Sequence, residues 1–167
     1  MQLNQQILPE FEQEMAHTRK SVERIPQDKW AWKAHDKSWS IGELTTHLVN
    51  IPNWALITMN TESFDVAPPG AEPPSPTPTN SAQEALTLLD KGVADLTQAL
   101  AQASDDDLMK PWTMLKGGEV LFAMPRLVVL RSFIFNHIIH HRAQLGVYLR
   151  LCGVAVPDIY GPTADET

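Results

Sequence analysis

The segment from residue 126 to residue 145 contains no Pro or Gly and carries apolar side chains on nearly every face of a helix. A helix that is apolar all round has to contact several neighbours at once, so this segment, extended to about residues 124 to 151, predicts the central helix of the fold. Three other segments, near residues 3 to 25, 40 to 55 and 81 to 100, also show helical periodicity. None of the four shows the period-two alternation of a half-buried strand.

Capping residues and prolines divide the chain further. Ser40 and Ser81 are each followed three residues later by a glutamate, which is typical of a helix start. Pro9 suggests that regular helix begins only near that residue, and six prolines within residues 68 to 78 predict an extended strap. A Gly-Gly pair at residues 117 and 118 predicts a small hairpin or an irregular loop. The expected fold is therefore all-α, a four-helix bundle with a proline-rich crossover between helices two and three.

The composition limits the domain number, the partners and the compartment. A chain of 167 residues with 43% hydrophobic content suits one domain over residues 1–167. The net charge of −7, without a basic run, argues against nucleic acid as a partner. We expect a cytoplasmic protein without a membrane partner, because the chain has neither a signal peptide nor a stretch of about 18 apolar residues. Cys152 is the single cysteine, which excludes an internal disulfide.

Histidines in two of the expected helices suggest a metal site. His137 and His141 are four residues apart, so on a helix they share one face, roughly 5 to 6 Å apart. At 100° per residue His141 lies within the apolar stripe and His137 at its edge, whereas His140 points away. His47 lies at the edge of the stripe of the second helix. Three imidazoles with an open position form a reactive metal site, so we predict His47, His137 and His141 as ligands.

Simpler interpretations stay open beside this one. Each histidine alone is also explained as a core or boundary residue that is satisfied by a hydrogen bond. Gln144 could orient a ligand or be an exposed polar residue. The loop before the second helix contains Trp30, Trp32 and Trp39, which either anchor it to the core or stack on a ligand. Cys152 is better explained as a packing residue than as a nucleophile.

Two motifs and the C-terminal tail resemble the DinB-like (DinB/YfiT-like) superfamily of bacterial damage-inducible proteins. The motifs are Trp-Ser-Ile-Gly-Glu-Leu-Thr-Thr-His-Leu at residues 39–48 and Asn-His-Ile-Ile-His-His-Arg-Ala-Gln-Leu at residues 136–145; the tail covers residues 149–165. The resemblance implies an up-down-down-up bundle and a divalent metal, commonly nickel or zinc, on His47, His137 and His141. It does not imply the activity of the DNA polymerase that shares the name DinB.

Some members of this superfamily are S-transferases or isomerases that use mycothiol, bacillithiol or glutathione. The resemblance thus implies a low-molecular-weight thiol as cofactor and a small electrophile as ligand, and a three-histidine cation can lower the pKa of such a thiol. No Arg or Lys cluster stands beside the ligands, since Arg142 and Arg150 fall on other faces. The alternatives are a metal-dependent hydrolase, with Glu43 as the nearest acid, and a non-catalytic metal-binding stress-response protein.

The face of the fourth helix opposite His137 is also apolar. Val128, Phe135 and Ile139 lie roughly 160° to 200° from His137. Because a single bundle does not easily bury both faces of one helix, we predict a homodimer.

Overall fold

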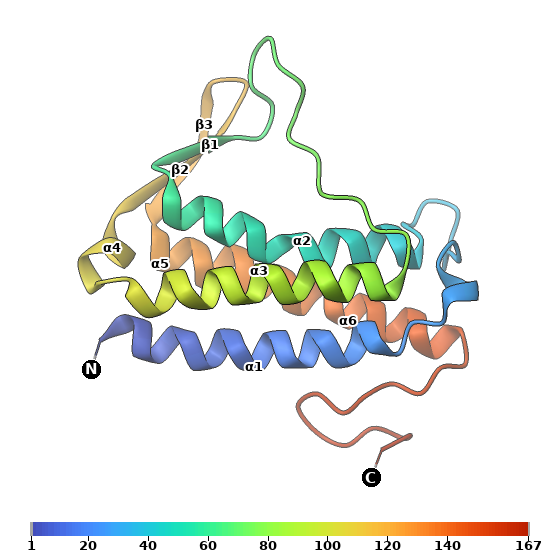
Figure 1. Ribbon diagram of the computed structural model, residues 1–167. Coiled ribbons are helices and arrows are strands. Elements are labelled where there is room, and N and C mark those ends of the chain that lie inside the picture. The colour runs from blue at the N-terminus through green and yellow to red at the C-terminus, as the bar shows by residue number, and fades with distance from the viewer. Residues whose placement is uncertain (1, 167) are drawn as a thin grey trace.

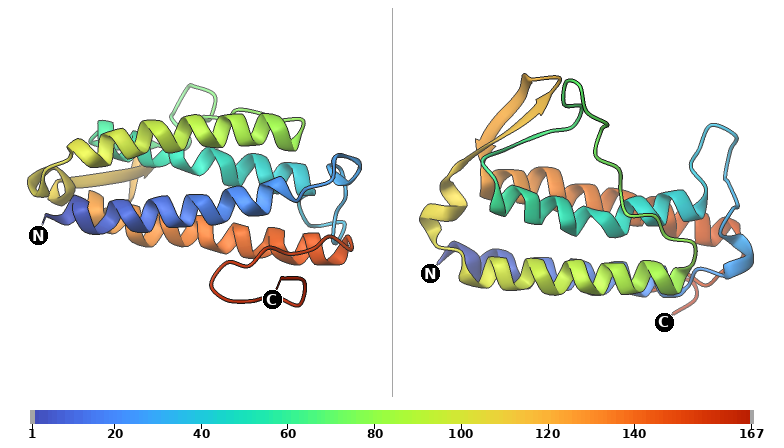
Figure 2. Two further views of the ribbon diagram at one scale, coloured as in Figure 1. Left: turned by 60° about the horizontal axis from the view of Figure 1, so that its bottom comes forward. Right: turned by 45° about the horizontal axis from the view of Figure 1, so that its top comes forward.

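The computed structural model describes residues 2 to 166, and its long helices lie side by side (Figure 1). These helices are α1 (Leu3–Glu23), α2 (Ile41–Asn60), α3 (Ala82–Gln102) and a last helical stretch made of α5 (Arg126–Val128), the π-helix η2 (Val129–Phe135) and α6 (Asn136–Leu151). In the right-hand view of Figure 2, α2 and α6 form one layer and α1 and α3 form the other. The short helices η1 (Gln27–Lys29) and α4 (Asp105–Met109) lie in the connections.

The helix starts follow the expected capping chemistry. The Ser40 hydroxyl accepts a hydrogen bond from the Glu43 backbone N–H at 3.1 Å, and the Glu43 carboxylate accepts one from the Ser40 N–H at 2.7 Å. The expectation that helix one begins near Pro9 is wrong, because α1 begins at Leu3. Pro9 is tolerated there because the carbonyl that loses its partner belongs to Gln5, an exposed residue in the first turns.

The core lies between the two helical layers, and it includes part of the face that we assigned to a dimer. Phe135 is fully buried and stacks on Phe11 of α1 with 5.7 Å between ring centroids. Ile139 is half-buried, and Val128 is 41% exposed. Helix α1 thus already covers a part of this face, and the homodimer stays a prediction.

A three-stranded mixed sheet extends from one end of the helices (Figure 1). Strands β2 (Pro111–Lys116) and β3 (Glu119–Pro125) form an antiparallel hairpin, and Gly117 and Gly118 turn the chain with φ angles of 65° and 84°. Strand β1 (Ser63–Asp65) pairs in parallel with β2. The expectation of an all-α four-helix bundle is therefore wrong, and of the two structures expected at the glycine pair, a hairpin or an irregular loop, the hairpin is present.

Strand β1 was not predicted from the sequence because its pairing with β2 is non-local. Strand β1 has three residues, too few for alternation to be visible, and its Ser63 aligns with Thr113, fifty positions away. The Asp65 carboxylate then accepts backbone N–H bonds from Gly117 at 3.0 Å and from Gly118 at 2.7 Å, which joins the end of β1 to the hairpin turn. Residues 124 and 125, expected in the last helix, belong to β3.

The expected proline-rich strap is confirmed as an extended connection between β1 and α3. Residues 66 to 80 contain no helix or strand and rise beside the hairpin before they descend to α3 (Figure 1). Asn50 of α2 holds the descending part with two hydrogen bonds: its amide nitrogen donates to the Thr77 carbonyl at 2.9 Å, and its amide oxygen accepts from the Thr77 N–H at 3.0 Å. Asn50 is 3% exposed, so the strap is fixed to the helices by a buried polar contact.

The chain after α6 folds back beneath the helices (Figure 1). Tyr160 of this tail donates its hydroxyl proton to the Glu14 carboxylate of α1 and accepts a bond from the Arg142 guanidinium of α6 at 2.6 Å. Within residues 2 to 166, no helix combines the length and the apolar character that crossing a membrane requires.

Candidate metal centre

The three predicted histidines meet between α2 and α6. His47 comes from α2, and His137 and His141 come from successive turns of α6. The ring centroids are 4.5 to 5.0 Å apart, and one ligand atom of each residue lies within 4.8 Å of the other two. Within the described part of the chain, no Asp, Glu or Cys joins this group. The structure therefore brings together the residues that the sequence singled out.

The π-helix η2 lies directly before the two histidines of α6. It ends at Phe135, and α6 begins at Asn136, one residue before His137. Its i→i+5 bonding changes the angular relation between side chains before and after this junction, and such segments often occur at functional sites. The uniform spacing of 100° per residue that we assumed for the whole segment holds within α6 but not across η2.

Burial favours the neutral form of all three imidazoles. Burial, with repulsion from His141 and His137 in their protonated forms, lowers the pKa of His47 to about 4. Burial, with repulsion from His141 and His140 in their protonated forms, lowers the pKa of His137 to about 4. Burial also lowers the pKa of His141. Neutral imidazoles keep the lone pairs that a metal ion requires.

The hydrogen-bond partners of the ring nitrogens differ among the three histidines. The Nδ1 atom of His141 lies 2.7 Å from Oε1 of Gln144, which makes Nδ1 the protonated nitrogen and leaves Nε2 as a donor atom for a metal. The Nε2 atoms of His47 and His137 face each other at 3.1 Å. Among the described residues, Nδ1 of His137 is buried without a hydrogen-bond partner. This arrangement of nitrogens fits a divalent transition-metal ion, and Gln144 has the position of an orienting residue.

Two tryptophans border the histidines. Trp39 lies 4.9 Å from His47 and 5.8 Å from His141 between ring centroids, and Trp54 lies 5.2 Å from His47 and 5.7 Å from His137. Of the three tryptophans near the loop, Trp39 is thus the one at the site, and it is 47% exposed. Trp54 follows His47 by seven positions, so helical spacing places it two turns along the same face, but the sequence did not assign it a role in the site.

Trp30 and Trp32 instead fix the loop that carries Trp39. Their carbonyls accept the backbone N–H groups of Gly42 and Ile41 at 2.8 and 2.9 Å. A Cβ atom on Gly42 would come within 2.4 Å of the Trp30 indole, so the absence of a side chain allows this close approach.

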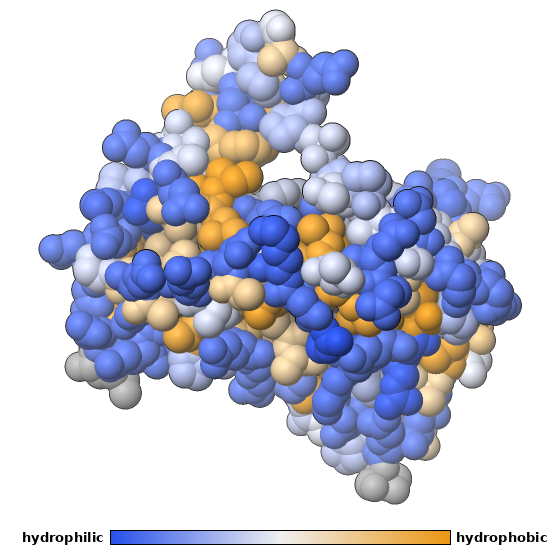
Figure 3. Space-filling view, in the orientation of Figure 1, coloured by the Kyte–Doolittle hydropathy of each residue, from blue (hydrophilic) through white to orange (hydrophobic). Residues whose placement is uncertain are grey.

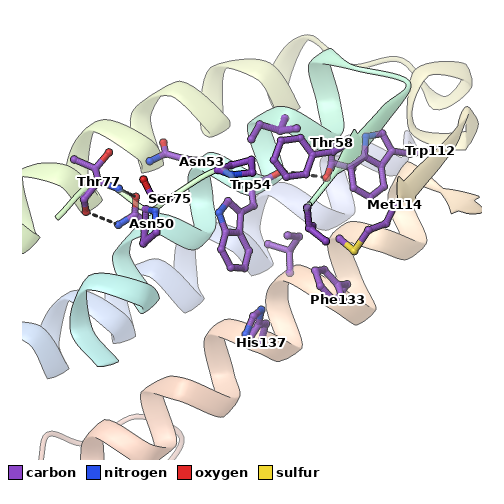
Figure 4. Close-up of a pocket in the computed structure, with 16 residues that line it drawn as sticks. Asn50, Asn53, Trp54, Thr58, Ser75, Thr77, Trp112, Met114, Phe133 and His137 are labelled. Carbon is purple, nitrogen blue, oxygen red and sulfur yellow. Dashed lines mark hydrogen bonds between the residues drawn. The ribbon is translucent and has the colours of Figure 1, made fainter. Parts of the chain in front are cut away.

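A cavity of about 490 Å³ opens beside His137 (Figure 4). Figure 3 shows the hollow below the raised sheet and strap, with hydrophobic side chains around it. The walls of the cavity come mainly from α2, the sheet, the strap and η2. The lining residues are Asn50, Asn53, Trp54, Ile57, Thr58, Phe64, Val66, Pro74, Ser75, Pro76, Thr77, Trp112, Met114, Phe133, Ile134 and His137. Sequence reasoning missed this cavity because no single segment forms it.

Other candidates lie apart from the histidines. His140 is exposed and stands outside the group. Glu43 is held by Ser40 in the capping box, and the hydrogen bonds from Ser40 lower the pKa of its carboxyl. Arg142 and Arg150 point to Glu14 and Asp165 instead of the site.

Cys152 packs against the hydrophobic core, half-buried. Burial raises the pKa of its thiol, which disfavours the reactive thiolate at neutral pH. The packing interpretation of this cysteine therefore agrees with the structure.

The metal-free protein is expected to lose stability as the pH falls from about 6.5 to about 4. His47 and His137 have an ordinary pKa of 6.5 when unfolded and about 4 when folded, so the unfolded chain binds more protons in this window. Their contribution is complete above pH 6.5 and is lost as the pH falls through the folded value. Thermal denaturation after EDTA dialysis at pH 7, 5.5 and 4.5 tests this. The doubly substituted His47→Gln, His137→Gln protein should show a smaller fall, and an equal fall in both proteins would contradict the prediction.

Comparisons with known proteins agree with this fold. The model of the DinB family matches residues 1–167. The uncharacterized protein YrdA of Bacillus subtilis is 28% identical over 159 residues, which are 95% of this chain and 89% of YrdA. A DinB-like protein of Bacillus cereus superposes with a TM-score of 0.74 at 21% identity, over 95% of this chain and 98% of that one. YjoA, a DinB-like protein of Bacillus subtilis, superposes with a TM-score of 0.68 at 20% identity, over 92% and 97% of the two chains. The match over the whole chain shows that this protein belongs to the DinB family.

Proposed function

We propose that His47, His137 and His141 bind one divalent metal ion, and that the protein is a metal-dependent thiol S-transferase acting on small electrophiles. The observation that carries this proposal is a group of three neutral imidazoles beside a cavity without charged side chains. Imidazole nitrogens suit zinc, nickel, copper and iron, and the resemblance to the superfamily favours nickel or zinc. Three protein ligands also leave a position for a small molecule at a tetrahedral ion.

The residues around the histidines favour a thiol over water as the nucleophile. A bound divalent ion would supply Lewis acidity, which lowers the pKa of a thiol or water ligand. Hydrolysis benefits further from a general base, but the histidine group includes no carboxylate within residues 2 to 166, and Glu43 serves the start of α2. A thiol has an ordinary pKa much closer to neutrality than that of water, so it needs no such base.

The chain's own residues would hold and shield the reactants. Gln144 fixes the ring of His141, and the rings of Trp39 and Trp54 pack against that of His47. In the proposed reaction the thiol sulfur forms a bond to a carbon of the electrophile, whose leaving group departs with the electron pair of the broken bond. The proton of the thiol goes to solvent.

Cobalt substitution tests this function directly. We expect glutathione, bacillithiol or mycothiol to add an intense sulfur-to-cobalt charge-transfer band to the spectrum of the cobalt-loaded protein, since thiolate is the form that coordinates. His140→Ala should retain the band, because His140 stands outside the ligand group. If all three thiols leave the spectrum of the stoichiometrically loaded protein unchanged, the transferase proposal is wrong, and a hydrolase or a non-catalytic metal-binding protein replaces it.

A further inference from the structure

We infer that the cavity beside His137 is the binding site for the electrophilic substrate, and that it selects a neutral molecule with an aromatic ring. The metal's part in this inference rests on the proposed function, whereas the ligand class follows from the cavity itself. His137 is both a member of the histidine group and a lining residue of the cavity, so one side chain connects the two sites (Figure 4).

The side chains that line the cavity disfavour a charged ligand. None of the sixteen side chains that line the cavity is an Asp, Glu, Lys or Arg. A charged ligand would lose its hydration in this cavity and find no ion-pair partner among the lining side chains, which disfavours its binding. A neutral ligand does not lose such hydration. Of two ligands with the same carbon skeleton, the cavity therefore favours the uncharged one.

Aromatic and thioether side chains form the walls. Four of these side chains surround the cavity in Figure 4: Trp54 of α2, Phe133 of η2, and Trp112 and Met114 of β2. The indole N–H of Trp112 already donates to the Thr61 hydroxyl at 3.1 Å, so this residue offers its apolar ring surface to the cavity. Flat rings pack well against such side chains through stacking, edge contacts and sulfur–aromatic contacts.

The cavity is formed before a ligand arrives. The two hydrogen bonds between Asn50 and Thr77 fix the strap next to Ser75, and the hydroxyls of Thr46 and Thr79 meet at 2.6 Å just beyond it. Opposite the strap, β1 is held by its pairing with β2. A volume of about 490 Å³ falls in the range of preformed small-molecule sites and accommodates a molecule of two or three rings.

The cavity lies next to the histidine group, so a ring bound in it would lie near His137. The rings of Phe133 and Trp54 each lie 5.7 Å from that of His137, so the aromatic walls reach the histidine group. A ring held between these walls would place its carbon atoms at the side of the site where His137 stands. This is the arrangement that transfer of a thiol to a ring-bearing electrophile requires.

Two fluorescent probes with the same skeleton test the ligand class. N-phenyl-1-naphthylamine is neutral, and 1-anilinonaphthalene-8-sulfonate adds one negative charge. In metal-free protein, prepared by EDTA dialysis, we expect the neutral probe to bind at least about tenfold more tightly than the sulfonate, because no lining side chain offers the sulfonate a positive charge. Equal or tighter binding of the sulfonate would overturn the inference.

Charge-insertion variants locate the bound probe. Ser75→Glu introduces a carboxylate into the lining from the exposed strap, and Ala71→Glu is its control on the same strap outside the cavity. Met114→Glu and its control Val120→Glu, at a residue 62% exposed on β3, repeat the comparison on the sheet. Both lining variants should weaken the neutral probe by about tenfold or more, whereas both controls should leave it unchanged. Unchanged affinity in Ser75→Glu and in a folded Met114→Glu protein would overturn the inference.

A paramagnetic measurement then separates the cavity from the metal proposal. Protons of the bound neutral probe should relax faster in cobalt-loaded protein than in zinc-loaded protein, because His137 belongs to both sites. Equal relaxation in the two loaded proteins would show that the cavity does not serve the metal. If neither ion binds, the proposed function fails, while the probe should still bind to the His141→Ala protein as it does to the unchanged chain.

Discussion

Alanine at His47, His137 or His141 is expected to abolish stoichiometric metal binding. Each of these side chains supplies one of the three ring nitrogens that lie within 4.8 Å of one another, and among residues 2 to 166 no carboxylate or thiol joins them as a substitute. Removing one of three ligands should lower the metal content from about one ion per chain to below about 0.1. Elemental analysis of protein purified without nickel resin measures this content.

His140→Ala is the matched control for that experiment. It removes an imidazole adjacent in sequence to His141, yet His140 is exposed and outside the group, so the metal content should stay near one ion per chain. Full metal retention by His141→Ala would contradict the assignment. Metal at about 100 times its dissociation constant should also stabilise the unchanged protein by about 2.7 kcal/mol, and none of the three ligand variants should show that gain.

Arg142→Ala is expected to lower the free energy of unfolding by about 3 to 5 kcal/mol. The Arg142 guanidinium lies 2.6 Å from the Glu14 carboxylate, and the two residues are only 4% and 6% exposed. The Arg142 guanidinium also donates to the Glu14 backbone carbonyl at 2.9 Å, and the Tyr160 hydroxyl donates to the Glu14 carboxylate. Without the guanidinium, a buried carboxylate would keep its charge and lose its cation.

Urea denaturation of Arg142→Ala and Arg150→Ala measures this difference. The ion pair of Arg150 with Asp165 is more exposed, with side-chain exposures of 49% and 24%, so its loss should cost less than about 1 kcal/mol. Adding Glu14→Gln to Arg142→Ala should recover part of the lost stability, since it removes the unpaired charge. A loss below about 1 kcal/mol in Arg142→Ala would show that water reaches Glu14 and that the pair does not anchor the tail.

Local patterns accounted for the helices and for the histidines of the candidate site. The capping box of Ser40 and Glu43 marked the start of α2, because both of its hydrogen bonds form within four residues. The four-residue spacing of His137 and His141 placed them on one face of α6, because α-helical geometry relates i and i+4 directly. The apolar stripes of α2 and α6 then had to meet in the core, which brought His47 to the same place.

Local sequence patterns therefore predicted the four long helical segments, the extended strap and the convergence of three histidines, and they offered a hairpin as one of two structures at Gly117 and Gly118. The tertiary structure alone decided that a mixed sheet completes the fold, that Phe135 faces α1, and that sheet, strap and η2 enclose a cavity beside His137. The physical reason is the range of the interactions. Capping and helical periodicity act within a few residues, whereas the pairing of Ser63 with Thr113 and the hydrogen bonds of Asn50 to Thr77 join distant segments, whose meeting depends on the packing of the whole chain.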